Sequence, residues 1–254
     1  MKKIALITGA SSGFGSLFAS KLSTMLNSID EYYLVARRED KLIEISKTVS
    51  KPCKIIPLDL QKEESAYKLA EILSEDKVSV KMLINCAGFG IYGDFFESEA
   101  KDVTGMIDLN CKALTMITKE VIPFMCDNSR IINIASSAAF LPQKNFAVYA
   151  ASKSFVLSFT RALNCELDDL NIYCTAVCPG PADTNFFNIA LENSMDLPFY
   201  KEMFMADAGS VVDKAIKDSI CKRPVSVYGL PMKALRLVSK LVPTSVALGF
   251  MKYI

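Results

Sequence analysis

The sequence of 254 residues contains no histidine and no tryptophan. Without histidine it has no Ser-His-Asp triad, no paired-histidine metalloprotease helix and no histidine-ligated zinc. Proton transfer near neutral pH must then use a tyrosine, lysine, cysteine or carboxylate whose pKa is moved by its surroundings. The formal net charge is only +1, so the chain lacks the basic excess typical of nucleic-acid binding, and no nucleic-acid partner is expected.

The eight cysteines include no CxxC pair, which excludes zinc knuckles and thioredoxin-like motifs, and no metal site is predicted. Most of them lie in apolar segments, as buried free thiols do, and this is typical of a reducing compartment. A signal peptide is not expected, because Thr-Gly-Ala-Ser-Ser-Gly interrupts the short apolar part of 4–20. No stretch is apolar enough for a spanning helix, so we predict a cytoplasmic protein.

Short apolar runs alternate with longer amphipathic segments along the chain. The apolar runs are 4–8, 32–36, 53–58, 82–86, 130–135, 172–178 and 225–228. They are continuous, as in strands buried on both faces of a parallel sheet. The segments with helical periodicity lie near 14–26, 39–50, 61–75, 100–126, 150–169 and 208–221. This pattern predicts an α/β fold over residues 1–254, a single-domain, Rossmann-like, doubly wound parallel sheet with helices on both faces.

The first apolar run ends in Thr-Gly-Ala-Ser-Ser-Gly-Phe-Gly at 8–15, and a helical segment follows. Glycines let the chain turn tightly and let a pyrophosphate approach the backbone, and the helix N-terminus presents free N–H groups. No Lys-Ser/Thr follows the last glycine, which excludes a Walker A loop. The position of this turn between a strand and a helix indicates dinucleotide binding.

The residues after the second apolar run indicate which dinucleotide binds. NAD-binding folds commonly place a carboxylate there, on the ribose 2′-hydroxyl. This chain has Ala36 followed by Arg37 and Arg38. A carboxylate would repel a 2′-phosphate, whereas a guanidinium pairs with it through several donors. NADP(H) is therefore favoured over NAD(H).

Tyr149 and Lys153 are four residues apart in a helical segment, so their side chains lie on one helix face. At ~4 Å an ammonium attracts a phenolate by ~4 kcal/mol, enough to lower the pKa of Tyr149 from ~10 to about 7 to 8. Such a phenol is a usable acid/base in a chain without histidine. Ser136, or alternatively Ser137, follows the strand 130–135 at the same rim of the sheet, where a hydroxyl can bond a substrate carbonyl.

Together these motifs resemble the short-chain dehydrogenase/reductase family. The matching positions, all within 8–184, are Thr-Gly-x-x-x-Gly-x-Gly at 8–15, Asp59-Leu60, Asn85-Cys86-Ala87-Gly88, Asn110, Ser136, Tyr149, Lys153, Pro179-Gly180 and Thr184. The chain departs from the family at Cys86, where a second asparagine is common. The resemblance weakens after residue 184.

The resemblance implies a role for each matching residue. Tyr149 would be the acid/base, and Lys153 would lower its pKa and hold the nicotinamide ribose. Ser136 would orient the substrate oxygen, and Asn110 would hold a water in the proton relay. Cofactor contacts would come from Gly9, Ser11, Ser12, Gly13, Phe14, Gly15, Arg37, Arg38, Asp59, Leu60, Asn85, Ala87, Gly88, Tyr149, Lys153, Pro179, Gly180, Ala182 and Thr184.

The resemblance further implies an NADP(H)-dependent oxidoreductase of a carbonyl/alcohol pair that forms a homodimer or homotetramer. A lid at about 184–207 is rich in methionine and aromatic residues. These suit a bulky apolar substrate such as a steroid, a bile acid or an acyl chain, and helical core packing explains them equally well. A non-catalytic NADP(H)-binding sensor or scaffold is the alternative, and an epimerase or dehydratase of nucleotide sugars is a third hypothesis. The presence of all four catalytic positions favours the oxidoreductase.

The segment at about 230–254 is basic and amphipathic. No acidic residue follows Asp218, whereas six lysines and arginines do. Such a segment can rest on an anionic membrane surface. It can equally cover the lid or a subunit interface, and the cover is the favoured interpretation.

Overall fold

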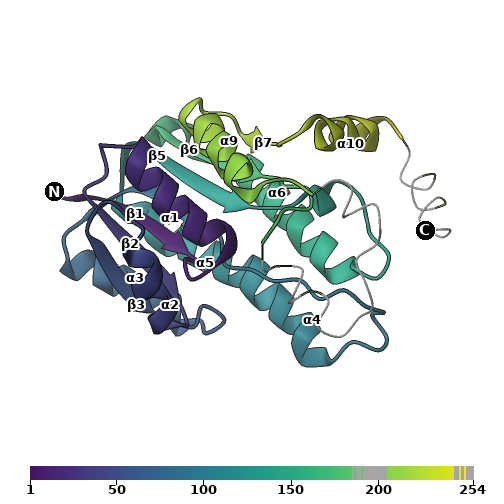
Figure 1. Ribbon diagram of the computed structural model, residues 1–254, viewed down its shortest axis with the longest axis horizontal. Helices are drawn as coiled ribbons and strands as arrows, with labels where there is room; N and C mark the ends of the chain where they lie inside the picture. Colours follow the sequence, from purple (N-terminus) through teal and green to yellow (C-terminus); the bar gives the residue numbers. More distant parts are fainter. Residues whose placement is uncertain (185, 187–189, 191–204, 243–245, 247–248, 250–254) are drawn as a thin grey trace.

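The computed structural model describes residues 1–184, 186, 190, 205–242, 246 and 249. Its centre is a seven-stranded sheet in the order β3-β2-β1-β4-β5-β6-β7, in which every neighbouring pair is parallel (Figure 1). The strands are β1 (Lys3–Thr8), β2 (Glu31–Ala36), β3 (Cys53–Pro57), β4 (Ser79–Asn85), β5 (Met125–Ile134), β6 (Ile172–Val177) and β7 (Val225–Ser226). The order reverses between β1 and β4, which is where doubly wound sheets bind ligands.

Helices lie on both faces of this sheet. The helices of the described residues are α1 (Gly13–Met25), α2 (Glu39–Ser46), α3 (Glu64–Glu75), α4 (Ala100–Ile107), α5 (Leu114–Val121), α6 (Ala147–Glu166), α9 (Ala208–Ile220) and α10 (Leu230–Leu241). On one face α1 packs on α9, and on the other α3 packs on α5. This arrangement confirms the predicted doubly wound parallel sheet.

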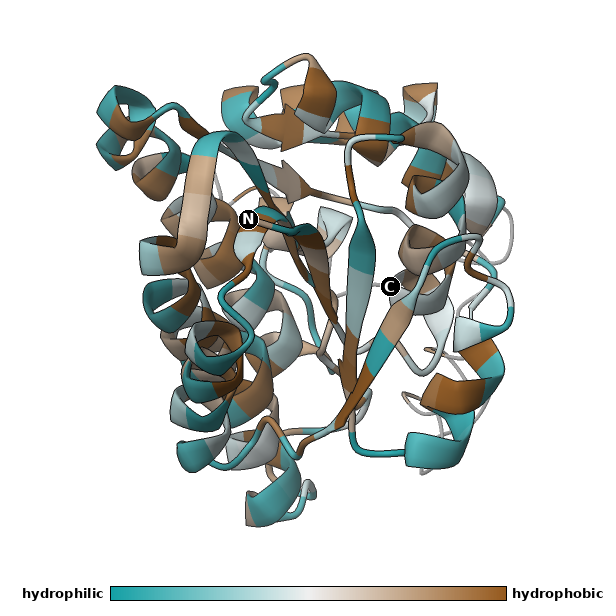
Figure 2. Ribbon diagram, turned by 90° about the vertical axis from the view of Figure 1, so that its left-hand side faces the viewer, coloured by the Kyte–Doolittle hydropathy of each residue, from teal (hydrophilic) through white to brown (hydrophobic). Residues whose placement is uncertain are grey.

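The strands are apolar on both sides because both sides are buried. In β1, Ala5 and Ile7 belong to the core cluster that contains the α1 and α9 side chains, whereas Ile4 and Leu6 belong to the cluster of α3 and α5. All four are fully buried. In Figure 2 the central strands are largely hydrophobic, whereas the helices alternate between hydrophobic and hydrophilic residues. The continuous apolar runs of the sequence follow directly from this two-sided burial.

The segment 100–126 differs from the single helix that its periodicity predicts. It contains α4, a π-helical turn at Asp108–Ala113, α5 and a short 3₁₀ turn at Ile122–Phe124, and β5 begins at Met125. Pro123 lies in the 3₁₀ turn and lacks the N–H that would continue α5. The π-helical turn contains Asn110, one of the predicted catalytic residues.

The predicted lid at 184–207 is described only at its ends and at residues 186 and 190. Ala182 and Ala206 form an isolated parallel bridge, which joins the two ends. The remaining lid residues on which the prediction of an apolar substrate was based lie outside the described residues: Phe187, Ile189, Leu191, Met195, Leu197, Phe199, Tyr200, Met203 and Phe204. The last five residues of the predicted C-terminal segment, 250–254, also lie outside them.

Candidate active site

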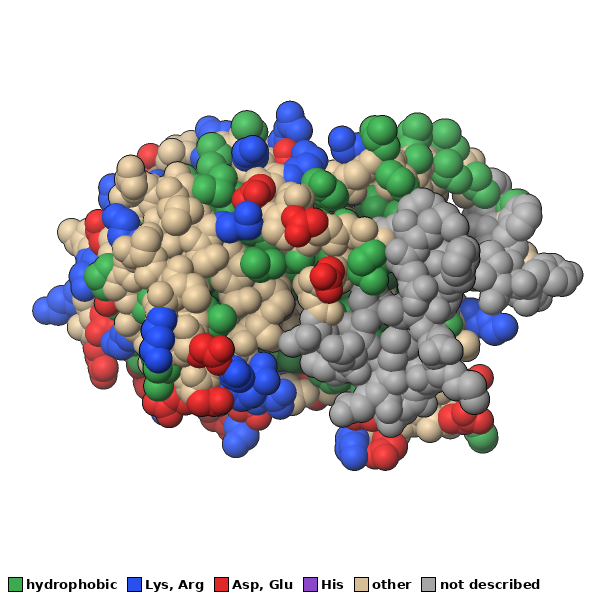
Figure 3. Space-filling model, viewed as in Figure 1, with side chains coloured by type: hydrophobic (Ala, Val, Ile, Leu, Met, Phe, Trp, Pro, Cys, Tyr) green, Lys and Arg blue, Asp and Glu red, His purple; other side chains and the backbone are tan. Residues whose placement is uncertain are grey.

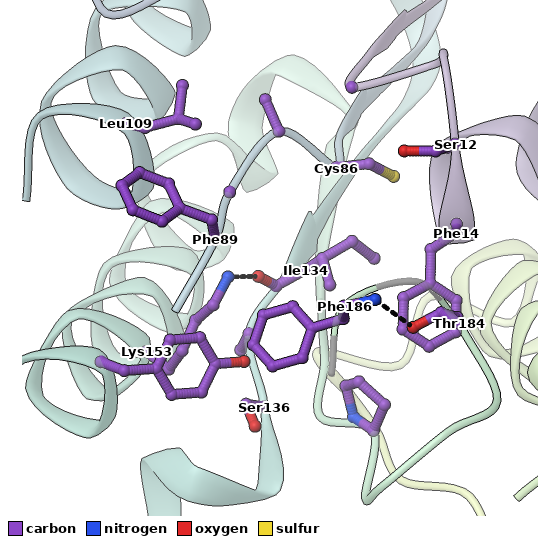
Figure 4. Close-up of a pocket in the computed structure, with 18 of the residues that line it drawn as sticks. Ser12, Phe14, Cys86, Phe89, Leu109, Ile134, Ser136, Lys153, Thr184 and Phe186 are labelled. Atoms are coloured by element: carbon purple, nitrogen blue, oxygen red, sulfur yellow. Dashed lines mark hydrogen bonds between the residues drawn. The ribbon is translucent and has the colours of Figure 1, made fainter. Parts of the chain in front are cut away.

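A cleft of about 760 Å³ lies at the carboxyl ends of the strands (Figure 4). The loops that follow β1 to β6 all contribute to its walls. The predicted site residues that line it are Gly9, Ser11, Ser12, Gly13, Phe14, Gly15, Arg37, Arg38, Asp59, Leu60, Ala87, Gly88, Ser136, Tyr149, Lys153, Pro179, Gly180, Ala182 and Thr184. Residues separated by up to 175 positions in the chain (9 to 184) thus share one cavity.

Two glycines of the turn after β1, Gly9 and Gly15, have no room for a side chain. Gly9 has a φ of +64°, and a Cβ added there would lie 2.7 Å from the backbone nitrogen of Ala87. A Cβ added at Gly15 would lie 2.2 Å from the carbonyl oxygen of Gly9. Ser12 precedes α1 without capping it through its side chain. The first N–H groups of α1 and its partial positive charge therefore face the cleft, which fits a dinucleotide pyrophosphate.

Two arginines lie at the adjacent wall of the cleft, where β2 ends. Arg37 and Arg38 are exposed and line the cleft next to Ala36. The Arg38 guanidinium donates a long hydrogen bond of 3.5 Å to the Ser11 hydroxyl. The Arg38 side chain thus lies beside the glycine turn, where a guanidinium suits a phosphate on the adenosine half of a dinucleotide.

Tyr149 and Lys153 come from the first two turns of α6 and are both buried. The ammonium nitrogen of Lys153 lies 5.7 Å from the centre of the Tyr149 ring, so the two side chains share one helix face as the spacing predicts. Its hydrogen bond, however, goes to the carbonyl oxygen of Ile134 at the end of β5, at 2.8 Å (Figure 4).

The expected lowering of the phenol pKa is not found. Burial raises the pKa of Tyr149 to about 12, and a hydrogen bond with the Ser136 hydroxyl lowers it only in part. Burial also lowers the pKa of Lys153 to about 8. The spacing argument used charge attraction alone, whereas in the folded chain the loss of water around both groups is the larger effect. At neutral pH the phenol is therefore protonated.

The two candidate serines differ in what they contact. Ser136 is buried, and its hydroxyl accepts a hydrogen bond from the N–H of Ala138 at 3.1 Å. The same hydroxyl is hydrogen-bonded to the phenol of Tyr149. Ser137 also lines the cleft, and its N–H donates to the carbonyl of Pro179. The contact with the phenol favours Ser136 as the residue that orients a substrate oxygen.

Two predicted residues, Asn85 and Asn110, do not line the cleft. The amide nitrogen of Asn85 donates to Thr118 and Asn133, which joins β4 to α5 and β5. Asn110 is almost fully buried, accepts from the N–H of Phe89 and donates to the carbonyl of the same residue. Asn110 therefore holds the backbone of a residue that lines the cleft, whereas Asn85 links β4 to its neighbours.

Aromatic rings surround the phenol of Tyr149. Phe186 belongs to the predicted lid, whereas no sequence motif indicated Phe146. The Phe146 ring stacks on that of Tyr149 with centroids 4.2 Å apart, and the Phe186 ring lies at 5.3 Å. Gly90 makes room for this cluster, because a Cβ there would lie 2.6 Å from the Tyr149 ring. Phe146 precedes Tyr149 by three residues, so helical spacing was the only signal that placed the two rings together.

Comparison with known proteins agrees with this geometry. A family model for short chain dehydrogenases matches residues 3–194. The chain is 34% identical over 192 residues to sulfoacetaldehyde reductase 2 of Chromohalobacter salexigens, which covers 73% of this chain and 75% of that protein.

Solved structures share the whole fold. A short-chain dehydrogenase from Sphingobium yanoikuyae in complex with NADPH has a TM-score of 0.79 and 27% identity, covering 100% of this chain and 96% of that one. The bulky-bulky ketone specific alcohol dehydrogenase from Comamonas testosteroni has a TM-score of 0.74 and 26% identity, covering 99% and 94%. With the family match, the parallel sheet and the cleft at its switch point, the chain belongs to the short-chain dehydrogenase family of oxidoreductases.

Proposed function

We propose that this protein is an NADP(H)-dependent oxidoreductase that interconverts a carbonyl and an alcohol on a bulky apolar substrate. The observation that carries the proposal is the buried Tyr149–Lys153 pair, which opens into the same cleft as the glycine turn. That cleft brings a proton donor and a dinucleotide cradle within reach of one small molecule. The dinucleotide, when bound, supplies or accepts the hydride.

Tyr149 is the acid/base in this proposal. With a pKa of about 12 its phenol keeps its proton at neutral pH and can donate it to a carbonyl oxygen as negative charge develops there. The Ser136 hydroxyl beside it holds the same oxygen. The ammonium of Lys153, 5.7 Å from the ring centre, stabilises the phenolate that remains. Asn110 acts indirectly, because its amide holds the Phe89 backbone in place.

The preference for NADP(H) rests on Arg37 and Arg38, which line the cleft at the end of β2. The dehydrogenase from Sphingobium yanoikuyae was solved with NADPH, and one from Burkholderia phymatum with NAD. The relatives therefore support a nicotinamide dinucleotide, and the two guanidinium groups support the phosphorylated one. The expected assembly is a homodimer or homotetramer in the cytoplasm.

The preference for an apolar substrate rests on the rings around Tyr149. Phe146 and Phe186 line the cleft beside the phenol, with Phe89 nearby on the same wall. The similarity to an alcohol dehydrogenase named for bulky-bulky ketones agrees with this, whereas the similarity to a sulfoacetaldehyde reductase points to a small polar substrate. The aromatic walls favour the former.

Oxidation of NADPH with a panel of ketones tests the proposal. The panel includes steroids, acyl thioesters and small polar aldehydes, and the variant is Tyr149→Phe. We expect turnover of the apolar ketones and a loss in Tyr149→Phe of about a hundred-fold or more, since general acid catalysis contributes about 10² to 10⁴. Tyr67→Phe, on the half-exposed surface of α3, is the matched control. Equal turnover in the wild type and Tyr149→Phe would contradict the role assigned to Tyr149, whereas binding of NADPH without turnover of any substrate in the panel would support the alternative, a dinucleotide-binding sensor or scaffold.

A further inference from the structure

Helix α10 has its apolar side turned outward. A surface helix of a globular protein normally buries its apolar stripe and exposes its polar one. In α10 the exposed large hydrophobic side chains are Leu230 at 80%, Leu241 at 73%, Leu237 at 61% and Val238 at 49%. Together with Ala234 they recur at helical spacing and form one line along the helix, which we call the outward stripe.

The opposite side of α10 holds the helix to the body of the protein. Met232 packs against the core cluster that contains Val227 and Cys178. An added Cβ on Gly180 would meet its sulfur at 2.7 Å, so the helix also touches the loop after β6. Figure 1 shows α10 beside the sheet domain, and Figure 3 shows hydrophobic side chains gathered over it on the visible surface. The outward stripe therefore lies on the side of the helix away from Met232, which contacts the body of the protein.

Positive charge borders the outward stripe. Lys233 and Lys240 are exposed, and their positions lie along one edge of it. The nearest acidic residue before them in the sequence is Asp218, and none follows up to residue 254. The helix thus presents apolar side chains flanked by lysines, with no acidic residue close in the sequence. This pattern matches the interfacial layer of an anionic lipid bilayer, where acyl chains lie below phosphate groups.

We propose that the outward stripe of α10 docks this protein on an anionic membrane surface. The leucines enter the boundary between headgroups and acyl chains, and Lys233 and Lys240 lie at the level of the lipid phosphates. In the described part of the chain no helix is long and apolar enough to cross a membrane, so α10 lies in the plane of the surface. With 12 residues it extends about 18 Å along it.

The charge of α10 also favours a membrane over a second copy of the chain as the partner of the outward stripe. A two-fold interface through the outward stripe would bring the same helix from both copies together. With the two helices antiparallel, the lysine edges of the two copies would meet, and the segment after Asp218 has no carboxylate side chain to neutralise them. Lipid phosphates neutralise them instead.

Flotation of the full chain with vesicles tests the proposal. The vesicles are phosphatidylcholine alone and phosphatidylcholine with phosphatidylserine. We expect binding to the anionic vesicles that weakens as salt is added. Lys233→Gln with Lys240→Gln should lower the partition coefficient about 25-fold, at about five-fold for each lysine. Leu237→Gln with Leu241→Gln should lower it by at least about a hundred-fold. All four side chains are exposed, so the fold is expected to survive, and the thermal melting temperature checks it.

Matched control variants distinguish vesicle binding through the outward stripe from non-specific binding through other exposed apolar or basic residues. Ile43→Gln with Leu170→Gln removes two exposed apolar side chains elsewhere, and Lys47→Gln with Lys68→Gln removes two exposed lysines. Both should bind like the wild type. Absence of vesicle binding, or binding that the leucine pair does not change, overturns the proposal. Loss of a dimer in Leu237→Gln with Leu241→Gln, without vesicle binding by the wild type, overturns it in favour of a protein interface.

Discussion

The ammonium nitrogen of Lys153 donates a 2.8 Å hydrogen bond to the carbonyl oxygen of Ile134. Ile134 is the last residue of β5, and Lys153 lies in the second turn of α6. The bond therefore fixes the helix that carries Tyr149 against the strand end that leads to Ser136. It also holds a charged group in a buried site, where the ionised form is destabilised and the pKa falls to about 8.

Because Lys153 is buried, we expect the free energy of unfolding to depend on pH. The pKa of Lys153 is about 8 in the folded chain against an ordinary value of 10.5. Between these values the unfolded chain binds more protons than the folded one, so this group makes the free energy of unfolding rise with pH. We expect the free energy of unfolding of the wild type, taken relative to that of Lys153→Met, to rise by on the order of 3 kcal/mol across that window.

Urea unfolding at several pH values between 8 and 10.5 measures this difference. Other groups titrate in the same range, and subtracting the Lys153→Met curve removes their contribution. Lys68→Met, at an exposed position on α3, should follow the wild type. A difference between the wild type and Lys153→Met that stays constant with pH would show that the lysine is not destabilised by burial.

Gly90 and Gly93 provide a matched pair for the aromatic cluster. A Cβ at Gly90 would lie 2.6 Å from the Tyr149 ring and 3.0 Å from the rings of Phe146 and Phe186, whereas a Cβ at Gly93 meets nothing within 4 Å. Gly90→Ala should displace the phenol and reduce kcat about ten- to a hundred-fold, because a misplacement of ~1 Å costs that much. Gly93→Ala should be unchanged. Equal kcat values in the two variants would mean that the position of the ring is unimportant.

Replacing each serine separately distinguishes Ser136 from Ser137. Ser136→Ala removes the hydroxyl that acts on Tyr149, and we expect kcat to fall about a hundred-fold or more, as for other donors to a developing oxyanion. Ser137→Ala keeps its backbone bond to Pro179 and should change kcat by less than about three-fold. NADPH affinity, followed by fluorescence, should be similar in both variants. The reverse order of effects would assign the substrate contact to Ser137.

Arg37 and Arg38 should set the dinucleotide preference. Charged hydrogen bonds contribute about 1.5–3 kcal/mol each, so Arg37→Ala with Arg38→Ala should raise the KM for NADPH by at least about a hundred-fold and leave the KM for NADH nearly unchanged. Steady-state rates with each dinucleotide measure the ratio. Arg161→Ala, at an exposed position on α6, is the control. A parallel rise in both KM values would place the arginines elsewhere than at the 2′-phosphate.

Much of the fold could be predicted because its signals are local or repeat at short range. The apolar run at 4–8 is continuous because Ile4 and Leu6 face one core and Ala5 and Ile7 the other. The interruption of the predicted helix at 100–126 could not be predicted from the sequence pattern. Its π-helical turn is stabilised by distant partners, since Asn110 bonds the backbone of Phe89, and helical periodicity does not register such contacts.

The sequence by itself determined the parallel sheet, the glycine turn that needs positive φ angles, and the four-residue spacing that places Tyr149 and Lys153 on one helix face. These depend on the chirality of the backbone and on the period of a strand or helix. Only the tertiary structure decided the protonation of that pair, the rings of Phe146 and Phe186 beside it, and the outward direction of the apolar stripe of α10. Burial and solvent exposure depend on which remote segments pack together, and no local pattern in the chain specifies them.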